Sequence, residues 1–472
     1  MFESVKDLSE AVKTAATIEG DRITVSSAAA LAPEVVDRLA WTAAFGASPE
    51  IKGTARWVIR SVAAAAGIRP ASIHDLYIAM GEGKTGGFTV PAINVRAMGY
   101  ETARAVIRAA KKLNAGAFIF EIARSEIGYT EQRPHEYAAI LFAAALREGF
   151  TGPLFIQGDH VQTNAKKYNS PERDKELETL RGLIREEIAA GFYNIDIDTS
   201  TLVEQQEVNV TLAADFAAYI RSVEPSGVTV SIGGEIGEVG GKNSDIHELH
   251  CYMDGLNAKL KERGIAVGIS KISVQTGTAH GGFINADGTV RKDVAIDLEA
   301  LQELSTAART YGMGGAVQHG ASTLPLDAFD AFPRVGACEI HLATDFQNMV
   351  YDHPQFPAAL KAEMYAWLQE NAKEERKPKD TEEQFLYKAR KKAIGPFKKQ
   401  LWGMDTEPRA AIGASLEERF TRLMTLLKIN GTAAAVKQFV TAPEVPLKLD
   451  AEVKAAAGII TADERKAEGL AD

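Results

Sequence analysis

Three of the nine histidines in the chain follow or end short apolar segments that lie far apart in the sequence. They are His160, His280 and His319. Two acidic residues, Asp198 and Glu235, occupy the same kind of position near the ends of two further apolar segments. Imidazole nitrogens and carboxylate oxygens are ligands for Zn²⁺ and Co²⁺, and such a site can leave a position open for a substrate. The five residues therefore predict a metal site if the fold brings them together.

Taken one at a time, these residues also have ordinary explanations. A single histidine beside a glycine is more often a hydrogen-bonded residue at the edge of a fold than a metal ligand. Glu235 alone could accept hydrogen bonds from the amides of its own loop. The metal hypothesis depends on the five side chains reaching one common face.

Eight short apolar runs alternate with amphipathic, helical stretches from about residue 76 onward. The runs cover residues 89–95, 117–123, 154–159, 194–198, 228–236, 271–276, 316–320 and 338–344. Continuous apolar strands between helices are typical of a parallel sheet covered on both faces. Eight of them predict an α/β fold, a closed (β/α)₈ TIM barrel, with an open doubly wound sheet as the alternative. In such a barrel the chemistry lies at the carboxyl ends of the strands, where the five residues fall.

The regions outside the barrel are expected to be helical. Residues 1–75 are rich in alanine and predict an N-terminal helical extension, before a barrel over 76–365. A C-terminal helical arm is expected over 366–430, where Ser415 begins a helix with a capping box. The tail over 431–472 has no assigned role.

Composition excludes several classes of protein. With 46% hydrophobic and 25% charged residues, the 472-residue chain is neither collagen-like nor disordered. A net charge of −10 gives no basic footprint for nucleic acid, and no run reaches the ~18 apolar residues of a membrane span. Two cysteines and an N-terminus without an apolar signal segment favour the cytoplasm. We therefore expect a cytoplasmic enzyme with a small-molecule substrate and neither nucleic acid nor membrane as partner.

Seven segments of the chain, in order, resemble those of the class II, metal-dependent fructose-bisphosphate aldolases and their tagatose-bisphosphate relatives. They are GGFTVPAINV, GDH, IDTS, GGEIGEVGG, TAHGG, QHGAS and LATDFQ. Seven segments in the family's order are far more specific than any one of them. The resemblance implies reversible aldol cleavage of a ketose bisphosphate, with fructose 1,6-bisphosphate as the first choice. The products would be dihydroxyacetone phosphate and an aldehyde phosphate.

The resemblance also implies how the metal is held. His160, His280 and His319 match the ligands of the catalytic divalent ion, which is usually zinc, with cobalt or another divalent ion as an alternative. Glu235 matches a carboxylate of the family, and Asp198 matches a ligand of an alternative or second metal position.

The remaining matches concern the substrate. Asp159 corresponds to the acid/base that handles the aldehyde oxygen formed at carbon–carbon cleavage. The residues implied to contact the substrate or its phosphates are Asn94, Gly281, Gly320, Ser322, Ala343, Thr344 and Arg419. In the family the arginine that Arg419 matches reaches into a neighbouring subunit, so we expect a homodimer or homotetramer. An exposed helical arginine paired with nearby glutamates is the alternative explanation.

The sequence departs from the family pattern at two places. His341 stands where the family has an asparagine that contacts the substrate, and we expect it to take part in catalysis with a shifted substrate preference. The acidic residue that often follows the Gly-Gly pair after the fifth strand is also missing. Asp245 is the best replacement, with Glu238 and His247 behind it.

Three functions stay open at this point. The leading one is a zinc-type aldolase acting on a ketose bisphosphate. The second is a metal lyase for another phosphorylated ketose, such as tagatose bisphosphate or a ketose 1-phosphate. The third is a non-catalytic, aldolase-like subunit, against which the presence of Asp159 beside a full histidine set argues.

Overall fold

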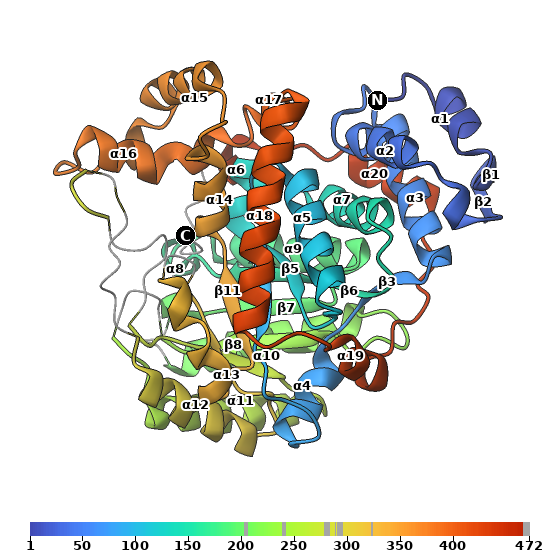
Figure 1. The fold of residues 1–472 in the computed structure, drawn as a ribbon. Coiled ribbons are helices and arrows are strands. Elements are labelled where there is room, and N and C mark those ends of the chain that lie inside the picture. The colour runs from blue at the N-terminus through green and yellow to red at the C-terminus, as the bar shows by residue number, and fades with distance from the viewer. Residues whose placement is uncertain are drawn as a thin grey trace.

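Eight parallel strands close into a barrel, as predicted (Figure 1). In this computed structural model the described residues are 1–202, 206–237, 242–277, 284–287, 289, 296–321 and 324–465. The barrel strands are β4 (Val90–Asn94), β5 (Ile119–Ala123), β6 (Gly152–Gln162), β7 (Asn194–Asp198), β8 (Ser231–Glu235), β9 (Lys271–Val274), β10 (Ala316–Gln318) and β11 (Glu339–Leu342). Their order is β6-β5-β4-β11-β10-β9-β8-β7, and pairing between β6 and β7 closes the ring.

Helices cover the outside of the barrel because each carries one apolar face. In α5, for example, Ala103, Val106 and Ile107 are buried while Lys111 and Lys112 face water. The helices of this layer are α5 (Gly99–Lys112), α6 (Arg124–Thr130), α7 (Pro134–Arg147), α8 (Ala165–Tyr168), α9 (Arg173–Ala190), α10 (Gln206–Val223), α11 (Ile246–Glu262), α12 (Leu298–Thr310), α13 (Ala331–Val335) and α14 (Thr344–Tyr351). Within the described part of the chain, every helix is too short or too polar to cross a lipid bilayer.

The N-terminal region contains strands as well as the expected helices. Its elements are α1 (Val5–Val12), β1 (Ala16–Glu19), β2 (Arg22–Val25), α2 (Pro33–Phe45), α3 (Pro49–Ala65), β3 (Ile68–Ala71) and α4 (His74–Gly81). β1 and β2 form an antiparallel hairpin with a left-handed Gly20 in its turn (φ 63°), and β3 pairs with the start of β6. β-branched residues on both sides of the Gly20 turn favour the hairpin over the helix that the alanine content suggested.

The C-terminal region is helical, as expected. It contains α15 (Ala358–Asn371), α16 (Glu382–Ala389), α17 (Lys398–Trp402), α18 (Thr406–Leu426), α19 (Ala433–Phe439), α20 (Leu449–Ala456) and α21 (Ala462–Arg465). The predicted helix start at Ser415 is wrong, because α18 begins at Thr406 and passes through Ser415 without a break. The alanine-rich turn before Ser415 continues the helix instead of ending it.

Helix α20, in the tail that had no assigned role, packs against α3 of the N-terminal region. The approach is close, since a Cβ atom on Gly53 would lie 2.5 Å from Cα of Val453. The indole Nε1 of Trp57 also donates a hydrogen bond of 3.3 Å to the carbonyl of Leu447. Helix α3 of the N-terminal region and helix α20 of the C-terminal region therefore lie side by side, although the division of the chain at residues 75, 365 and 430 stays a prediction.

The barrel interior holds a fully buried lysine on β9. The Nζ atom of Lys271 lies 2.7 Å from the side-chain oxygen of Gln157 and 2.9 Å from Asp196, and it also contacts Glu339. Tyr77 of α4 donates a hydrogen bond to Glu339 from below. Burial alone would raise the pKa of Glu339, but Lys271 together with His341 outweighs burial and lowers this pKa to about 2. Lys271 is therefore the permanently charged cation beside Asp196 and Glu339, two buried carboxylates of the barrel interior.

Removing this charge should destabilise the whole barrel. We expect Lys271→Met to lower the free energy of unfolding by about 3–5 kcal/mol, because it leaves buried carboxylates without their cation. Lys259→Met is the control, since Lys259 pairs with an exposed Glu207 on the surface and should lose less than about 1 kcal/mol. Urea unfolding followed by circular dichroism measures both. Equal, small losses would contradict the structural importance of the buried ammonium group.

Candidate functional site

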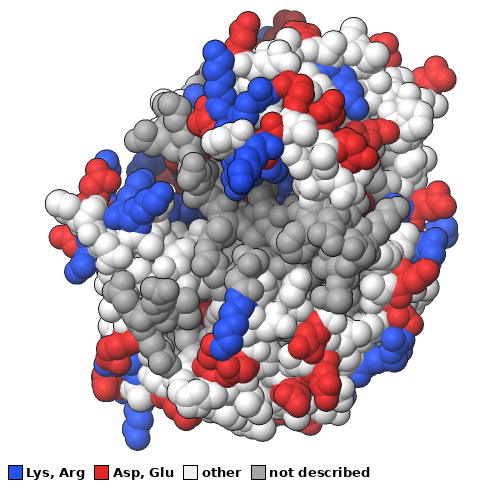
Figure 2. Space-filling view, turned by 90° about the vertical axis from the view of Figure 1, so that its left-hand side faces the viewer, with Lys and Arg blue, Asp and Glu red and all other residues white. Residues whose placement is uncertain are grey.

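The carboxyl ends of the strands open on one side of the molecule. Helices α8 and α14, which follow β6 and β11, lie on the left of Figure 1. Figure 2 shows this face, where lysine and arginine side chains lie above and to the left of the centre. Asp and Glu side chains lie among them and below the centre, so this face carries both signs of charge.

A β-bulge in β6 turns two consecutive side chains into this mouth. The register of β6 against β7 shifts between Gly158 and Val161, and His160 adopts a left-handed backbone conformation (φ 41°). Neighbouring residues of a regular strand point to opposite faces, so Asp159 and His160 could not both face the interior without this irregularity. A left-handed histidine is strained by roughly 1–3 kcal/mol, a kind of strain that clusters at functional sites.

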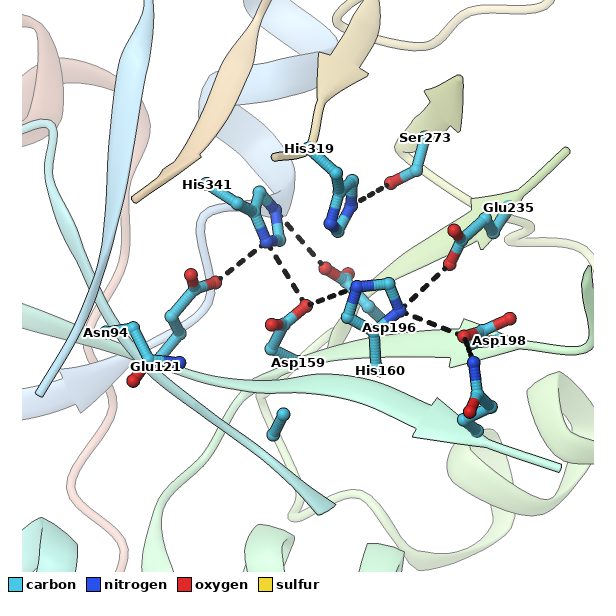
Figure 3. Close-up of polar contacts among 12 residues, drawn as sticks. Asn94, Glu121, Asp159, His160, Asp196, Asp198, Glu235, Ser273, His319 and His341 are labelled. Atoms are coloured by element: carbon cyan, nitrogen blue, oxygen red, sulfur yellow. Dashed lines mark hydrogen bonds and ion pairs between the residues drawn. The ribbon is translucent and has the colours of Figure 1, made fainter. Parts of the chain in front are cut away.

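His160, Glu235 and His319 come from three strands and present their ligand atoms to one another within 4.8 Å. The Nδ1 atom of His160 lies 3.2 Å from Glu235 and 2.9 Å from Asp198 (Figure 3). The Nε2 atom of His319 lies 2.9 Å from the hydroxyl of Ser273. All these side chains are buried. The structure thus brings together four of the five residues that the sequence singled out for a metal. His280, the fifth, lies outside the described residues, as do Gly281, Ser322 and Glu238.

His341 lies beside this group and contacts a second set of carboxylates. Its Nδ1 atom lies 3.0 Å from Glu121 and 3.1 Å from Asp159, and its Nε2 atom lies 2.6 Å from Glu339. Its ring centre is 3.9 Å from that of His319. Burial alone would lower the pKa of His341, but the carboxylates of Glu121 and Asp159 raise it well above its ordinary value.

The balance of charge in the mouth fits a divalent cation. Among the described residues, the barrel strands carry six buried carboxylic acids, and the basic groups near them are three imidazoles and one lysine. They are Glu121, Asp159, Asp196, Asp198, Glu235 and Glu339. Burial, together with nearby Asp198, raises the pKa of Glu235 to about 7, while His160 opposes this shift. A cation between His160, Glu235 and His319 would supply the missing positive charge, and this mixed nitrogen and oxygen set suits Zn²⁺ or Co²⁺.

The residues expected to hold phosphate lie at the ends of β10 and β11. Gly320 follows His319 in a left-handed conformation (φ 66°), which suits glycine. Ala343 is the N-cap of α14 and Thr344 its first residue, so the free amides of that helix begin there. Arg419 of α18 forms an ion pair with Asp345 of α14, within the same chain. The alternative explanation from the sequence was that Arg419 pairs with a glutamate, whereas its partner in the structure is an aspartate.

Two other expected residues have partners of their own. Asn94, at the end of β4, donates a hydrogen bond to Glu126 and accepts one of 3.2 Å from Arg96. Asp245 is exposed and caps α11, where it accepts the amide of Glu248 at 3.0 Å. Hydrogen bonding to that amide, partly opposed by the small effect of burial, lowers the pKa of Asp245. The structure does not bring Asp245 into the cluster, and its role in proton transfer stays a prediction.

Four charged residues inside the strands are absent from the set predicted from the sequence. They lie before the strand ends, where the site residues were expected, and are Glu121, Asp196, Lys271 and Glu339. A signal was available, because polar residues two apart alternate with apolar ones in NIDID, KISV and EIHL. In a strand this spacing places them on one face, which here is the barrel interior.

The comparisons with known proteins agree with this geometry. Residues 77–399 match the family described as fructose-bisphosphate aldolase class II, which is most of the chain. The chain therefore belongs to the class II aldolase family, whose members are enzymes that act on phosphorylated sugars.

Solved structures resemble this chain at low sequence identity. A protein from Sinorhizobium meliloti, described as a probable tagatose 6-phosphate kinase, is 19% identical with a TM-score of 0.51, over 78% of this chain and 97% of that chain. A fructose-bisphosphate aldolase from Campylobacter jejuni is 16% identical with a TM-score of 0.47, over 77% and 97%. A fructuronate-tagaturonate epimerase from Cohnella laeviribosi is 12% identical with a TM-score of 0.49, over 92% and 90%.

Metal affinity should rise with pH through the neutral range. An ion bound to Glu235 must displace the proton that this carboxyl holds below its pKa of about 7. One competing proton makes the dissociation constant for Zn²⁺ at least about tenfold lower at pH 8 than at pH 6. Competition with a chelator measures it, with circular dichroism at both pH values as the control for folding. Equal constants at pH 6 and pH 8 would contradict Glu235 as a ligand.

Proposed function

We propose that the protein catalyses the reversible, metal-dependent aldol cleavage of a phosphorylated ketose, with fructose 1,6-bisphosphate as the first candidate. The observation that carries this proposal is the position of Asp159. Its carboxylate lies next to the cluster of His160, Glu235 and His319, in the mouth of the barrel. A candidate acid/base thus adjoins a candidate metal site at the end of the barrel where such enzymes work.

His160 and His319, with Glu235, would hold the divalent ion, and His280 is the further expected ligand. Such an ion acts as a Lewis acid that withdraws electrons from a carbonyl group. Asp198 supports this arrangement, because its contact with His160 fixes the orientation of the ring.

The chain's own residues would handle the proton and the phosphate. During cleavage the C3–C4 bond of the ketose breaks and its electron pair moves towards the C2 carbonyl, while Asp159 takes the proton of the C4 hydroxyl. His341 holds the Asp159 carboxylate in place at 3.1 Å, and we assign to it the hydrogen bond to substrate that the family's asparagine provides. The amides at Ala343 and Thr344 would bind the phosphate on the C1 side. Arg419, close to α14, would bind a second phosphate.

A second candidate is a lyase for another phosphorylated ketose, such as tagatose bisphosphate or a ketose 1-phosphate. The observation that favours it is His341, a bulkier and titratable group in place of the family's asparagine, in contact with Glu121 and Asp159. The expected zinc or cobalt, the homodimer or homotetramer and the cytoplasmic location also remain predictions.

One assay tests the proposed function and ranks the substrates. Zinc-loaded protein is offered fructose 1,6-bisphosphate, tagatose 1,6-bisphosphate and fructose 1-phosphate, and the triose phosphate released is measured. We expect cleavage of at least one of them, loss of activity with a chelator and recovery when Zn²⁺ is restored. Bound metal without cleavage of any ketose phosphate would instead favour a non-catalytic subunit.

Asp159→Asn separates proton transfer from metal binding. We expect turnover to fall by about 10²–10⁴-fold, because a positioned acid/base is lost, while the zinc content stays near that of the unchanged protein. Asp174→Asn, at an exposed position on α9, is the matched control and should leave both quantities unchanged. Kinetics of triose phosphate release and elemental analysis measure the two quantities. Parallel loss of zinc and activity would make Asp159 a structural residue.

A further inference from the structure

A cavity of about 450 Å³ lies between the N-terminal helices α2 and α3, the barrel helices and the segment around α20, and none of the residues described at the barrel mouth lines it. Its walls come from the end of α2, from α3, from the loop after α6, from the start of α17 and from the segment between α20 and α21 (Figure 1). Six of the side chains that line it are basic: Lys52, Arg56, Arg133, Lys398, Lys399 and Arg465. We call it the basic cavity. Only two acidic residues, Glu131 and Glu136, line the same walls.

This concentration of positive charge occurs in a chain whose net charge is −10. Two of the cations are almost fully buried and share one carboxylate. Glu136 accepts a hydrogen bond of 3.3 Å from Arg56, which is 4% exposed, and contacts Lys398, which is 7% exposed. Buried cations are energetically unfavourable unless they are compensated, so a single shared carboxylate leaves this wall positive.

The other cations differ in whether they have a carboxylate partner. Arg133 pairs with Glu186 and Glu464 outside the cavity lining, and Arg465 pairs with Glu131 at 2.9 Å. For Lys52 and Lys399, by contrast, no carboxylate of the described residues lies within ion-pair distance. These two lysines therefore add to the positive charge that Arg56 and Lys398 leave beside their single carboxylate.

The environment of Lys52 agrees with this surplus. Burial lowers its pKa, Glu136 partly offsets the effect, and the neighbouring Arg56 and Lys398 lower it further. A half-buried ammonium group that repels other cations in this way is stabilised by an anion from solution.

We propose that the basic cavity binds a small phosphate monoester. A phosphate monoester carries close to two negative charges at neutral pH, which matches the two unpaired lysines. Guanidinium groups and lysine ammonium groups are the side chains that bind phosphate oxygens most strongly. The volume is that of a pocket for a small metabolite. This site is separate from the barrel mouth and does not depend on the proposed aldol chemistry.

The site is built from parts of the chain that lie outside the family match as well as inside it. Lys52 and Arg56 precede residue 77, and Arg465 follows residue 399. Helix α6 connects the cavity to the barrel mouth, because Glu126 in its first turn holds Asn94 while Glu131 at its end lines the cavity. A ligand in the basic cavity would therefore contact the N-terminal helix α3 and the C-terminal segment around α20. It would also contact the end of α6, the helix whose Glu126 binds Asn94.

Binding of inorganic phosphate to the zinc-loaded protein tests the proposal by calorimetry. The double variant Lys52→Ala/Lys399→Ala should bind phosphate at least about tenfold more weakly, because both unpaired ammonium groups are gone. Neither lysine has an ion-pair partner among the described residues, so the variant should fold. Lys6→Ala/Lys112→Ala removes two exposed surface lysines and changes the net charge equally, and its affinity should stay that of the unchanged protein. A phosphate-binding component at the barrel mouth would persist in both variants.

A crystal soaked in tungstate, a phosphate analogue, locates the anion by anomalous scattering. We expect a tungstate ion between Lys52 and Lys399 in the unchanged protein and none there in the double variant. Ketose cleavage without added phosphate should be equal in the two proteins, so failure of the proposed function would not affect this test. Unchanged phosphate affinity in Lys52→Ala/Lys399→Ala, or tungstate at the barrel mouth alone, would overturn the proposal.

Discussion

Inside the barrel, the ammonium group of Lys271 lies against the carboxylates of Asp196 and Glu339. The charged side chains nearer the barrel mouth are positioned by contacts that begin at this group. Glu339, kept ionised by the lysine, holds one nitrogen of His341, and the other nitrogen of His341 meets Asp159. A low-dielectric interior tolerates such a chain of charges only when each has an opposite neighbour. The orientation of the candidate acid/base at the mouth therefore depends on a lysine deeper in the barrel interior.

The bulge in β6 provides the second constraint. It allows Asp159 and His160, adjacent in sequence, to face the same space, one towards His341 and the other towards Glu235 and Asp198. A candidate proton-transfer group is in this way fixed beside a candidate metal ligand by the backbone itself. The arrangement is rigid, because the strands on both sides are paired throughout the closed sheet.

Much of this architecture could be predicted from the sequence, for reasons that are local. Buried parallel strands are continuous apolar runs, and their polar ends placed His160, Asp198, Glu235 and His319 at one rim. The register shift at His160 could not be foreseen, because it depends on pairing with β7 and not on local composition. Lys271 and its partners were not predicted, because they lie inside the strands and not at the polar strand ends from which the site was predicted. The strands of the N-terminal region were hidden by its high alanine content, which favours helix.

The packing of α20 on α3 has a consequence for how the protein is made. A ribosome releases α3 long before α20, yet the indole of Trp57 in α3 donates its hydrogen bond to the carbonyl of Leu447 just before α20. The barrel between them can assemble while the chain is still growing. The packing of α3 is therefore finished only after α20 has been synthesised.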